Sequence, residues 1–204
     1  MVEKFERLGR ELAYEGIRIN MYRDYLKTPE GKEIVWDHIE HPGAAAVLPV
    51  TEDGKILLVN QFRNSVDRIT LELPAGGRES REEDFKVCAA RELEEETGYR
   101  SEDLEFLISV NTEIAFCNER IDIFVAKNLK PAKQNLDPDE FIDVKAYDVD
   151  ELIKMIFDCT IKDSKTMAAI LAYKEKYLKR PSIFAQRQRP SMPRSKARAA
   201  AETR

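Results

Sequence analysis

The most informative segment of the chain covers residues 77–99, which read GRESREEDFKVCAARELEEETGY. Its second half places four glutamates within five positions, at Glu92, Glu94, Glu95 and Glu96. Like charges at helical spacing destabilise a helix by about 0.2–0.5 kcal/mol per pair. We therefore expect a bound group of opposite charge to offset this repulsion.

The spacing of these glutamates decides which of them can act together. On an α-helix, residues three and four positions apart lie on one face, so Glu92, Glu95 and Glu96 project together and Glu94 points elsewhere. Three convergent carboxylates suit Mg²⁺, which takes oxygen ligands and keeps several waters, leaving room for phosphate oxygens. The alternative is a solvated acidic helix face, the usual meaning of an isolated acidic run.

The residues around the glutamates favour the metal site. Gly77 is followed after five residues by Glu83, and after seven more by the run RELEEETGY at 91–99. This spacing resembles the complete Nudix box, Gly-x5-Glu-x7-Arg-Glu-U-x-Glu-Glu-x-Gly-U, where U is bulky and apolar or aromatic. The chain is thus identified as a member of the Nudix hydrolase family and resembles its ADP-ribose pyrophosphatase branch. The similarity extends from about residue 16 to 178, through QFR at 61–63, ELPAG at 72–76, DEFIDV at 139–144 and DSKT at 163–166.

The resemblance implies a set of Mg²⁺ ligands, with Mn²⁺ as a substitute: Glu92, Glu95, Glu96 and the backbone carbonyl of Ala75. The Ala-Gly pair lies one residue further from Glu83 than the simplest register gives, so the carbonyl of Gly76 stays an alternative ligand. Glu83 and Arg91 are expected to support the box, because an arginine can hold a carboxylate with two hydrogen bonds.

Leu93, Phe85 and Ala89 should form the apolar face of the box helix and pack inward.

The resemblance also implies a catalytic carboxylate outside the box. Glu140 matches the late glutamate of the branch, in an acidic loop that can close over substrate. Glu95 is the box residue that we count as catalytic as well as metal-binding. Asp139 competes with Glu140, and a solvated acidic turn is the alternative for both.

Three further residues are expected to bind substrate by the same resemblance. Arg63 would meet the diphosphate, a role that its fork of donors fits. Trp36 would stack on adenine, from a partner subunit in some relatives, although a lone strand tryptophan usually packs in a core. Glu113 would contact a ribose. The loop at 112–119 lacks the proline of ADP-ribose enzymes, which keeps GDP-mannose or another nucleotide sugar as an alternative substrate.

The expected fold is α/β (α+β): a Nudix-type α/β/α sandwich with a mixed sheet, preceded by a small antiparallel sheet. Residues 1–42 would form N-terminal strands for dimerisation, 43–180 the hydrolase domain, and 181–204 a disordered basic tail. Residues 74–77 read as a loop, and the Asp53-Gly54 pair predicts a tight hairpin. Strands are expected at 16–26, 33–39, 44–50, 56–62, 70–73, 106–111, 121–126 and 142–147, and helices at 82–97, 149–158 and 164–178.

Composition excludes several classes of protein. The 204 residues are 43% hydrophobic with a net charge of −5, which suits one soluble α/β domain and argues against specific nucleic-acid binding. No run approaches the about 18 apolar residues of a membrane span, and the start lacks a signal-peptide core. Three unpaired cysteines fit a reducing cytoplasm.

Two alternatives to an ADP-ribose pyrophosphatase thus stay open. The first is an enzyme that hydrolyses another nucleoside diphosphate. The second is a protein that binds ADP-ribose without cleaving it, which the complete box disfavours.

Overall fold

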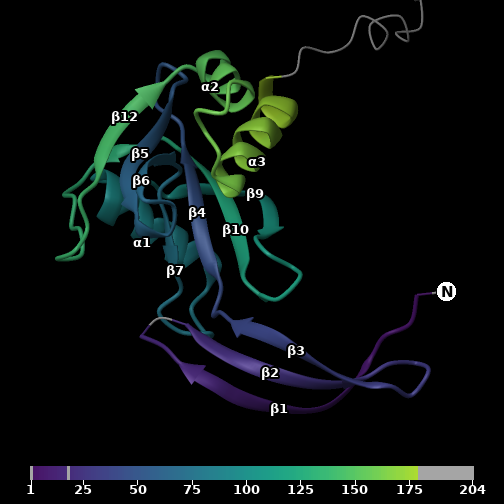
Figure 1. The fold of residues 1–204 in the computed structure, drawn as a ribbon. Helices are drawn as coiled ribbons and strands as arrows, with labels where there is room; N and C mark the ends of the chain where they lie inside the picture. The colour runs from purple at the N-terminus through teal and green to yellow at the C-terminus, as the bar shows by residue number, and fades with distance from the viewer. Residues whose placement is uncertain (1, 18, 179–204) are drawn as a thin grey trace, which may run out of the picture.

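The computed structural model describes residues 2–17 and 19–178, so the expected tail at 181–204 lies outside the described residues. It has two parts: a body of sheets and helices, and a three-stranded sheet that projects from one end of the body (Figure 1). In this part of the chain, no helix is long and apolar enough to cross a membrane.

The projecting sheet is antiparallel in the order β1-β2-β3, with strands Glu6–Glu15, Asn20–Lys27 and Glu33–Glu40. The small N-terminal sheet is therefore present, but the sequence reading missed β1 and began β2 four residues too early. Half of the ten residues of β1 are charged, which hides the apolar alternation on which strand prediction depends. Gly31 turns the chain between β2 and β3 with a φ of 87°.

The body contains a mixed sheet in the order β7-β4-β10-β9. Strands β4 and β10 pair in parallel, and the other pairs are antiparallel. A second sheet has the order β12-β5-β6, and β8 pairs with β11. The bounds are β4 Ala44–Pro49, β5 Ile56–Arg63, β6 Arg68–Glu72, β7 Ala75–Gly77, β8 Tyr99–Arg100, β9 Asp103–Asn111, β10 Arg120–Lys127, β11 Lys130–Pro131 and β12 Asp143–Tyr147.

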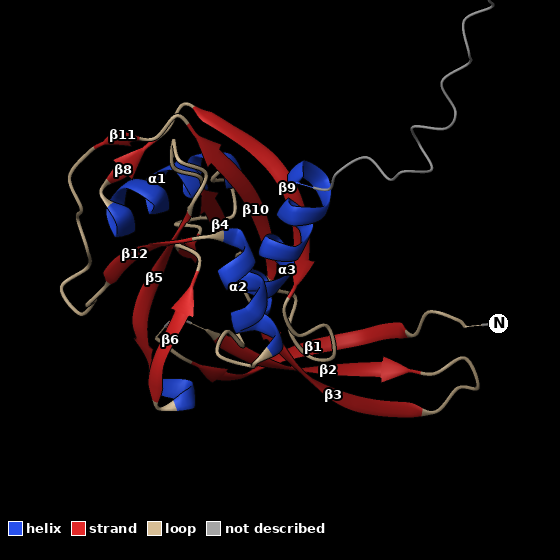
Figure 2. Cartoon of the chain, turned by 90° about the horizontal axis from the view of Figure 1, so that it is seen from above, coloured by secondary structure: helices blue, strands red, loops and turns tan. Residues whose placement is uncertain are grey.

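Helices cover both faces of the mixed sheet (Figure 2). They are α1 Phe85–Thr97, α2 Val149–Phe157 and α3 Ser164–Tyr173, with a π-helical turn at Lys174–Leu178 and a 3₁₀ turn at Asn64–Val66. Side chains alternate along β4, so Val47 packs with Leu93 of α1, whereas Leu48 packs with Leu152 of α2 and Ile170 of α3. The predicted α/β/α sandwich with a mixed sheet is confirmed.

Two local predictions around the sheets were wrong. Residues 75–77 were expected in a loop but form β7, because their backbone pairs with Ala44–Ala46 of β4. The turn at Gly54 exists, with a φ of 83°, yet the flanking strands β4 and β5 enter different sheets and meet only at a bridge between Val50 and Ile56.

Three helix boundaries also differ from the prediction. Helix α1 begins at Phe85 and not at residue 82, because Asp84 caps it and residues 78–83 form a loop around Arg78. Helix α2 begins at Val149 as expected but ends at Phe157, one residue early. The last helix changes from α to π after Tyr173.

Candidate active site

Helix α1 carries the glutamates of the box and is fixed at both ends. The Asp84 carboxylate accepts the backbone N–H groups of Lys86, at 2.8 Å, and Val87, at 3.4 Å. At the other end Gly98 adopts the left-handed conformation, with a φ of 70°, and its N–H reaches the Glu94 carbonyl. Leu93 and Ala89 are fully buried against the mixed sheet, as expected. This packing sets the rotation of the helix and turns Glu92 and Glu96 toward β7.

Glu92 and Glu96 are buried carboxylates, only 8% and 3% exposed. The backbone N–H of Ala75 donates to Glu96 Oε2 at 3.1 Å. A Cβ at Gly76 would clash with the Glu92 carboxylate, so only glycine leaves room for that side chain. Strand β7 and α1 thus hold the two carboxylates together.

The electrostatics of this pair suit a cation. Burial raises the pKa of Glu92 to about 7, and burial together with the charges of Glu92 and Glu140 raises the pKa of Glu96 to about 8. Two acids that are costly to ionise in the protein alone would be stabilised as carboxylates by a divalent ion. The donor set therefore fits a hard metal ion.

Arg91 connects the rest of the box. Its Nη1 donates to Glu92 Oε1 at 2.6 Å and to Glu95 Oε2 at 3.0 Å, and its Nε lies 3.4 Å from Glu83 Oε1. Its Nη2 donates to the Gly77 carbonyl at 3.1 Å. The expected contact between Glu83 and Arg91 is thus present. Arg91 thus lies against both Glu92 and Glu95. No three acidic, histidine or cysteine side chains within residues 2–17 and 19–178 are already gathered to hold a metal ion.

The loop that carries Glu140 lies near the buried pair. Its negative charge raises the pKa values of both Glu92 and Glu96. The preceding segment is tied to the end of α1, since Gln134 Nε2 donates to the Glu96 carbonyl at 2.7 Å and the Asn135 N–H to the Glu95 carbonyl at 3.0 Å. Glu140 is half-buried, with its Oε2 3.3 Å from the Asp137 N–H, whereas Asp139 is exposed.

A cavity of about 240 Å³ opens beside the box. It is lined by residues from β4, β5, β7, β10, the start of α3 and the segments that follow β3 and β9: His41, Ala44, Arg63, Ala75, Gly76, Gly77, Thr112, Glu119, Ile121, Asp163, Ser164 and Lys165. Arg63 therefore lies where a diphosphate beside the box could reach it.

A buried ionic cluster holds Arg63 in this cavity. The Glu72 carboxylate accepts Arg63 Nε at 2.9 Å and Nη2 at 2.8 Å, Lys165 Nζ at 2.5 Å and Thr70 Oγ1 at 2.6 Å. Burial alone would raise the Glu72 pKa, but Arg63 and Lys165 outweigh it and lower that pKa to about 2. Lys165 also lies 3.0 Å from Asp163 Oδ2.

The sequence reading did not assign roles to Glu72, Lys165, His41, Thr112 or Glu119, which lie in or behind the cavity. The first two belong to the segments ELPAG and DSKT, which resembled the branch. One feature of the sequence could have indicated a role for Lys165: it is a charged residue in the first turn of a helix that is otherwise largely apolar.

Two predicted substrate residues lie away from the cavity. Trp36 is half-exposed on the projecting sheet, with its ring 5.4 Å from that of Phe5. Glu113 is exposed in the loop after β9, where its backbone carbonyl accepts the N–H of Cys117 at 2.9 Å. The structure does not bring either residue to Arg63 within one chain.

Comparison with known proteins places this geometry in a family. The family model described as "NUDIX domain" matches residues 40–169, which run from the end of β3 to the middle of α3 and include the whole box. The chain belongs to the Nudix family.

Two curated relatives cover most of the Nudix chain. It is 40% identical over 162 residues to the methanol dehydrogenase activator of Bacillus methanolicus, covering 78% of this chain and 87% of the relative. It is 37% identical over 165 residues to the ADP-ribose pyrophosphatase of Bacillus subtilis, covering 80% and 89%. A crystal structure of an ADP compounds hydrolase shares the fold, with a TM-score of 0.76 and 19% identity over 86% of this chain and 95% of that one.

Proposed function

We propose that this Nudix protein hydrolyses the diphosphate bond of ADP-ribose, giving AMP and ribose 5-phosphate. The observation that carries the proposal is the pair of buried carboxylates, Glu92 and Glu96, beside a cavity in which Arg63 is held by Glu72. The pair suits a cation, and the arginine suits a diphosphate. The Bacillus subtilis relative supports this substrate through its name.

The proposed cofactor is Mg²⁺, with Mn²⁺ as a substitute. Glu92 and Glu96 would bind it, with Glu95 and the Ala75 carbonyl completing the protein ligands. The Gly76 alternative is weaker, because the Cys88 thiol lies 3.7 Å from that carbonyl oxygen on the helix side. When bound, such an ion polarises phosphoryl oxygens and lowers the pKa of water.

The residues of the chain would divide the remaining work. Arg63 would hold the diphosphate, while Lys165 shares the charge of Glu72 and keeps the Arg63 side chain from being fully neutralised. Water would attack one phosphorus and break the bond between that phosphorus and the bridging oxygen, so that the other phosphate leaves with the bridging oxygen. Glu140 would accept the proton of that water, because it lies near the pair on a loop anchored to α1. Glu95 is the other candidate base.

We also propose a homodimer built on the projecting sheet. A three-stranded sheet of this size buries little by itself, and Leu8, Leu12, Tyr14, Val35 and Trp36 are exposed on it. In this proposed dimer, Trp36 and Glu113 of one subunit would reach the cavity of the other subunit and bind substrate there. Free Cys88, Cys117 and Cys159 support a reducing compartment such as the cytoplasm.

A second substrate class is GDP-mannose or another nucleotide sugar. The loop at 112–119 favours it, because it lacks the proline of ADP-ribose enzymes, and its Thr112 and Glu119 line the cavity. The name of the Bacillus methanolicus relative describes an effect on another enzyme, so it does not choose between substrates.

The test is product analysis over a panel of nucleoside diphosphates, with Mg²⁺ and with EDTA. We expect AMP and ribose 5-phosphate from ADP-ribose at the highest kcat/KM, and no turnover in EDTA. A higher kcat/KM for GDP-mannose would transfer the assignment to the second class. Absence of metal-dependent turnover on every compound would contradict both.

A further inference from the structure

We propose that a second cavity, separate from the one beside the box, binds the phosphate group of a phosphate monoester. It has a volume of about 380 Å³ and lies between the end of β3, the loop of residues 78–84 and the start of β10. The residues that matter are Arg78, Arg81, Arg120, Phe85, Asn118 and His41. None of them has a role in the proposed hydrolysis.

The charge of this cavity is the first argument. Three arginines line it, and none of its described lining residues is acidic, although the chain as a whole carries a net charge of −5. Arg81 pairs with Glu40 at 2.8 Å, and Arg120 Nε lies 3.2 Å from Asp122 Oδ1. Arg78 donates to the carbonyls of Pro42, Arg81 and Glu83 and has no carboxylate partner in the described part of the chain. The cavity therefore retains positive charge, which attracts an anion.

The rigidity of the arginines is the second argument. The guanidinium carbons of Arg78 and Arg120 lie 4.3 and 4.2 Å from the centre of the Phe85 ring. Such stacking fixes the planes of both groups before a ligand arrives. An anion that binds there loses less free energy to the ordering of side chains than at a site of free surface lysines.

The remaining donors suit phosphate. Arg81 contacts Glu40 through Nη2, and Arg120 contacts Asp122 through Nε and Nη2, so in these contacts each arginine keeps Nη1 for a ligand. The Asn118 Oδ1 accepts the His41 N–H at 2.8 Å, which leaves the amide NH₂ of Asn118 as a further donor. Donors from three side chains can serve the several oxygens of a phosphate group.

The size of the cavity leaves room for a group attached to the phosphate. Its position makes it separate from the cavity beside the box. It exceeds the cavity beside the box, so a sugar joined to the phosphate has room. The two cavities share only His41, and Arg63 lines the first but not the second.

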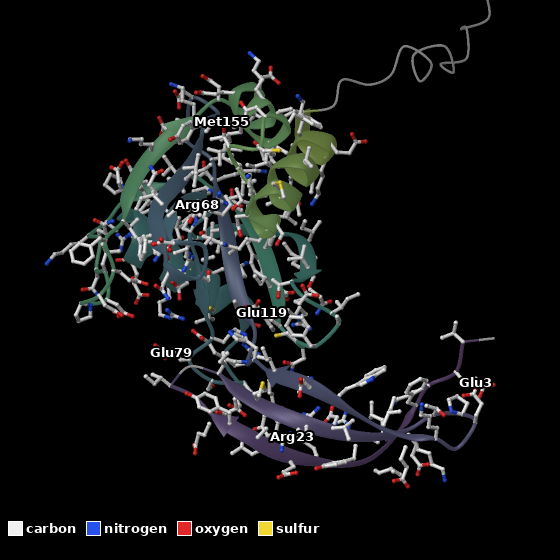
Figure 3. All side chains as sticks on the ribbon, in the orientation of Figure 1. Glu3, Arg23, Arg68, Glu79, Glu119 and Met155 are labelled. Atoms are coloured by element: carbon white, nitrogen blue, oxygen red, sulfur yellow. The ribbon has the colours of Figure 1, made fainter. Side chains whose placement is uncertain are left out.

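The test is calorimetric titration of the full chain, in EDTA, with glucose 6-phosphate, a phosphate monoester that is not a product of the proposed hydrolysis, and with inorganic phosphate. We expect both to bind, and both Arg120→Gln and Arg81→Gln to weaken each by about tenfold, the loss of a hydrogen bond to a charged group. Arg63→Gln and Arg23→Gln should change neither affinity. Arg23 is an exposed arginine on the projecting sheet, so it matches the change in net charge (Figure 3). Thermal unfolding of each variant shows whether it is folded, and the exposed Arg81 provides a test if Arg120→Gln is not.

Several results would overturn the proposal. Loss of binding in Arg63→Gln, with Arg120→Gln and Arg81→Gln unchanged, would place the phosphate beside the box. An equal loss in Arg23→Gln would show that only net charge matters. Binding of inorganic phosphate alone would exclude a monoester, and binding of neither compound would exclude the site.

Discussion

At the scale of single residues, the site depends on how closely β7 approaches α1. Gly76 has room for no Cβ because the Glu92 carboxylate occupies that space. The glycine at position 76 therefore decides where the side chain of Glu92, a proposed metal ligand, can lie.

Gly76→Ala should move or eject the Glu92 side chain. We expect a loss of about 1–3 kcal/mol in the free energy of unfolding, as for other overpacked sites, together with loss of metal-dependent activity. Urea unfolding measures the first effect. Gly77→Ala is the matched control, because a Cβ there meets nothing within 4 Å, and its stability should stay within about 0.5 kcal/mol. Wild-type metal-dependent activity in Gly76→Ala would contradict the close approach.

Glu72 should make the protein sensitive to acid. Its pKa is about 2 in the folded chain against 4.5 normally, so the folded state favours the carboxylate. The stability from this group is fully present above pH 4.5 and is lost as pH falls toward 2. The shift corresponds to about 3 kcal/mol.

Urea unfolding of wild type and Glu72→Gln between neutral pH and pH 2 measures this contribution. The difference in unfolding free energy between the two proteins should shrink as pH falls through that window. A difference that does not change with pH would show that Glu72 is not held as a carboxylate by Arg63 and Lys165.

At the scale of elements, helix α1 and the strands show which parts of the structure could be predicted from the sequence. Gly98 and the spacing of Glu92 and Glu96 were predictable because a cap residue and a helical period are local properties. Strands β1 and β7 were not, since each forms by pairing with residues elsewhere in the chain. The contact between Glu72 and Lys165 spans 93 residues, so no local pattern indicates it.

The start of α1 provides a test of local structure. Asp84 accepts two backbone N–H groups, so Asp84→Ala should lower the free energy of unfolding by about 1 kcal/mol. Asp148 occupies the same position before α2 but makes no capping hydrogen bond, so Asp148→Ala should be close to neutral. Chemical unfolding of both variants measures the contrast. A larger cost at Asp148 would contradict this difference in capping.

At the scale of the whole molecule, the projecting sheet has exposed apolar groups on a part of the chain with no helix against it (Figure 1). The proposed dimer predicts a mass in sedimentation equilibrium of twice 23.5 kDa. Leu12→Glu should shift that equilibrium toward the monomer, because it places a charge in an apolar contact. Ile69→Glu, a similarly exposed site on the body, should leave it unchanged. A wild-type monomer at all concentrations would remove the dimer from the proposal.

The central claim is that buried carboxylates on α1 gather a metal ion for cleavage of a diphosphate. The most direct measurement is the rate at which AMP and ribose 5-phosphate form from ADP-ribose in Mg²⁺, compared between wild type and Glu96→Gln. We predict a fall in kcat of about 100-fold or more in Glu96→Gln, with an unchanged circular dichroism spectrum, because the variant lacks one ligand charge. Near-normal turnover by folded Glu96→Gln would contradict the claim.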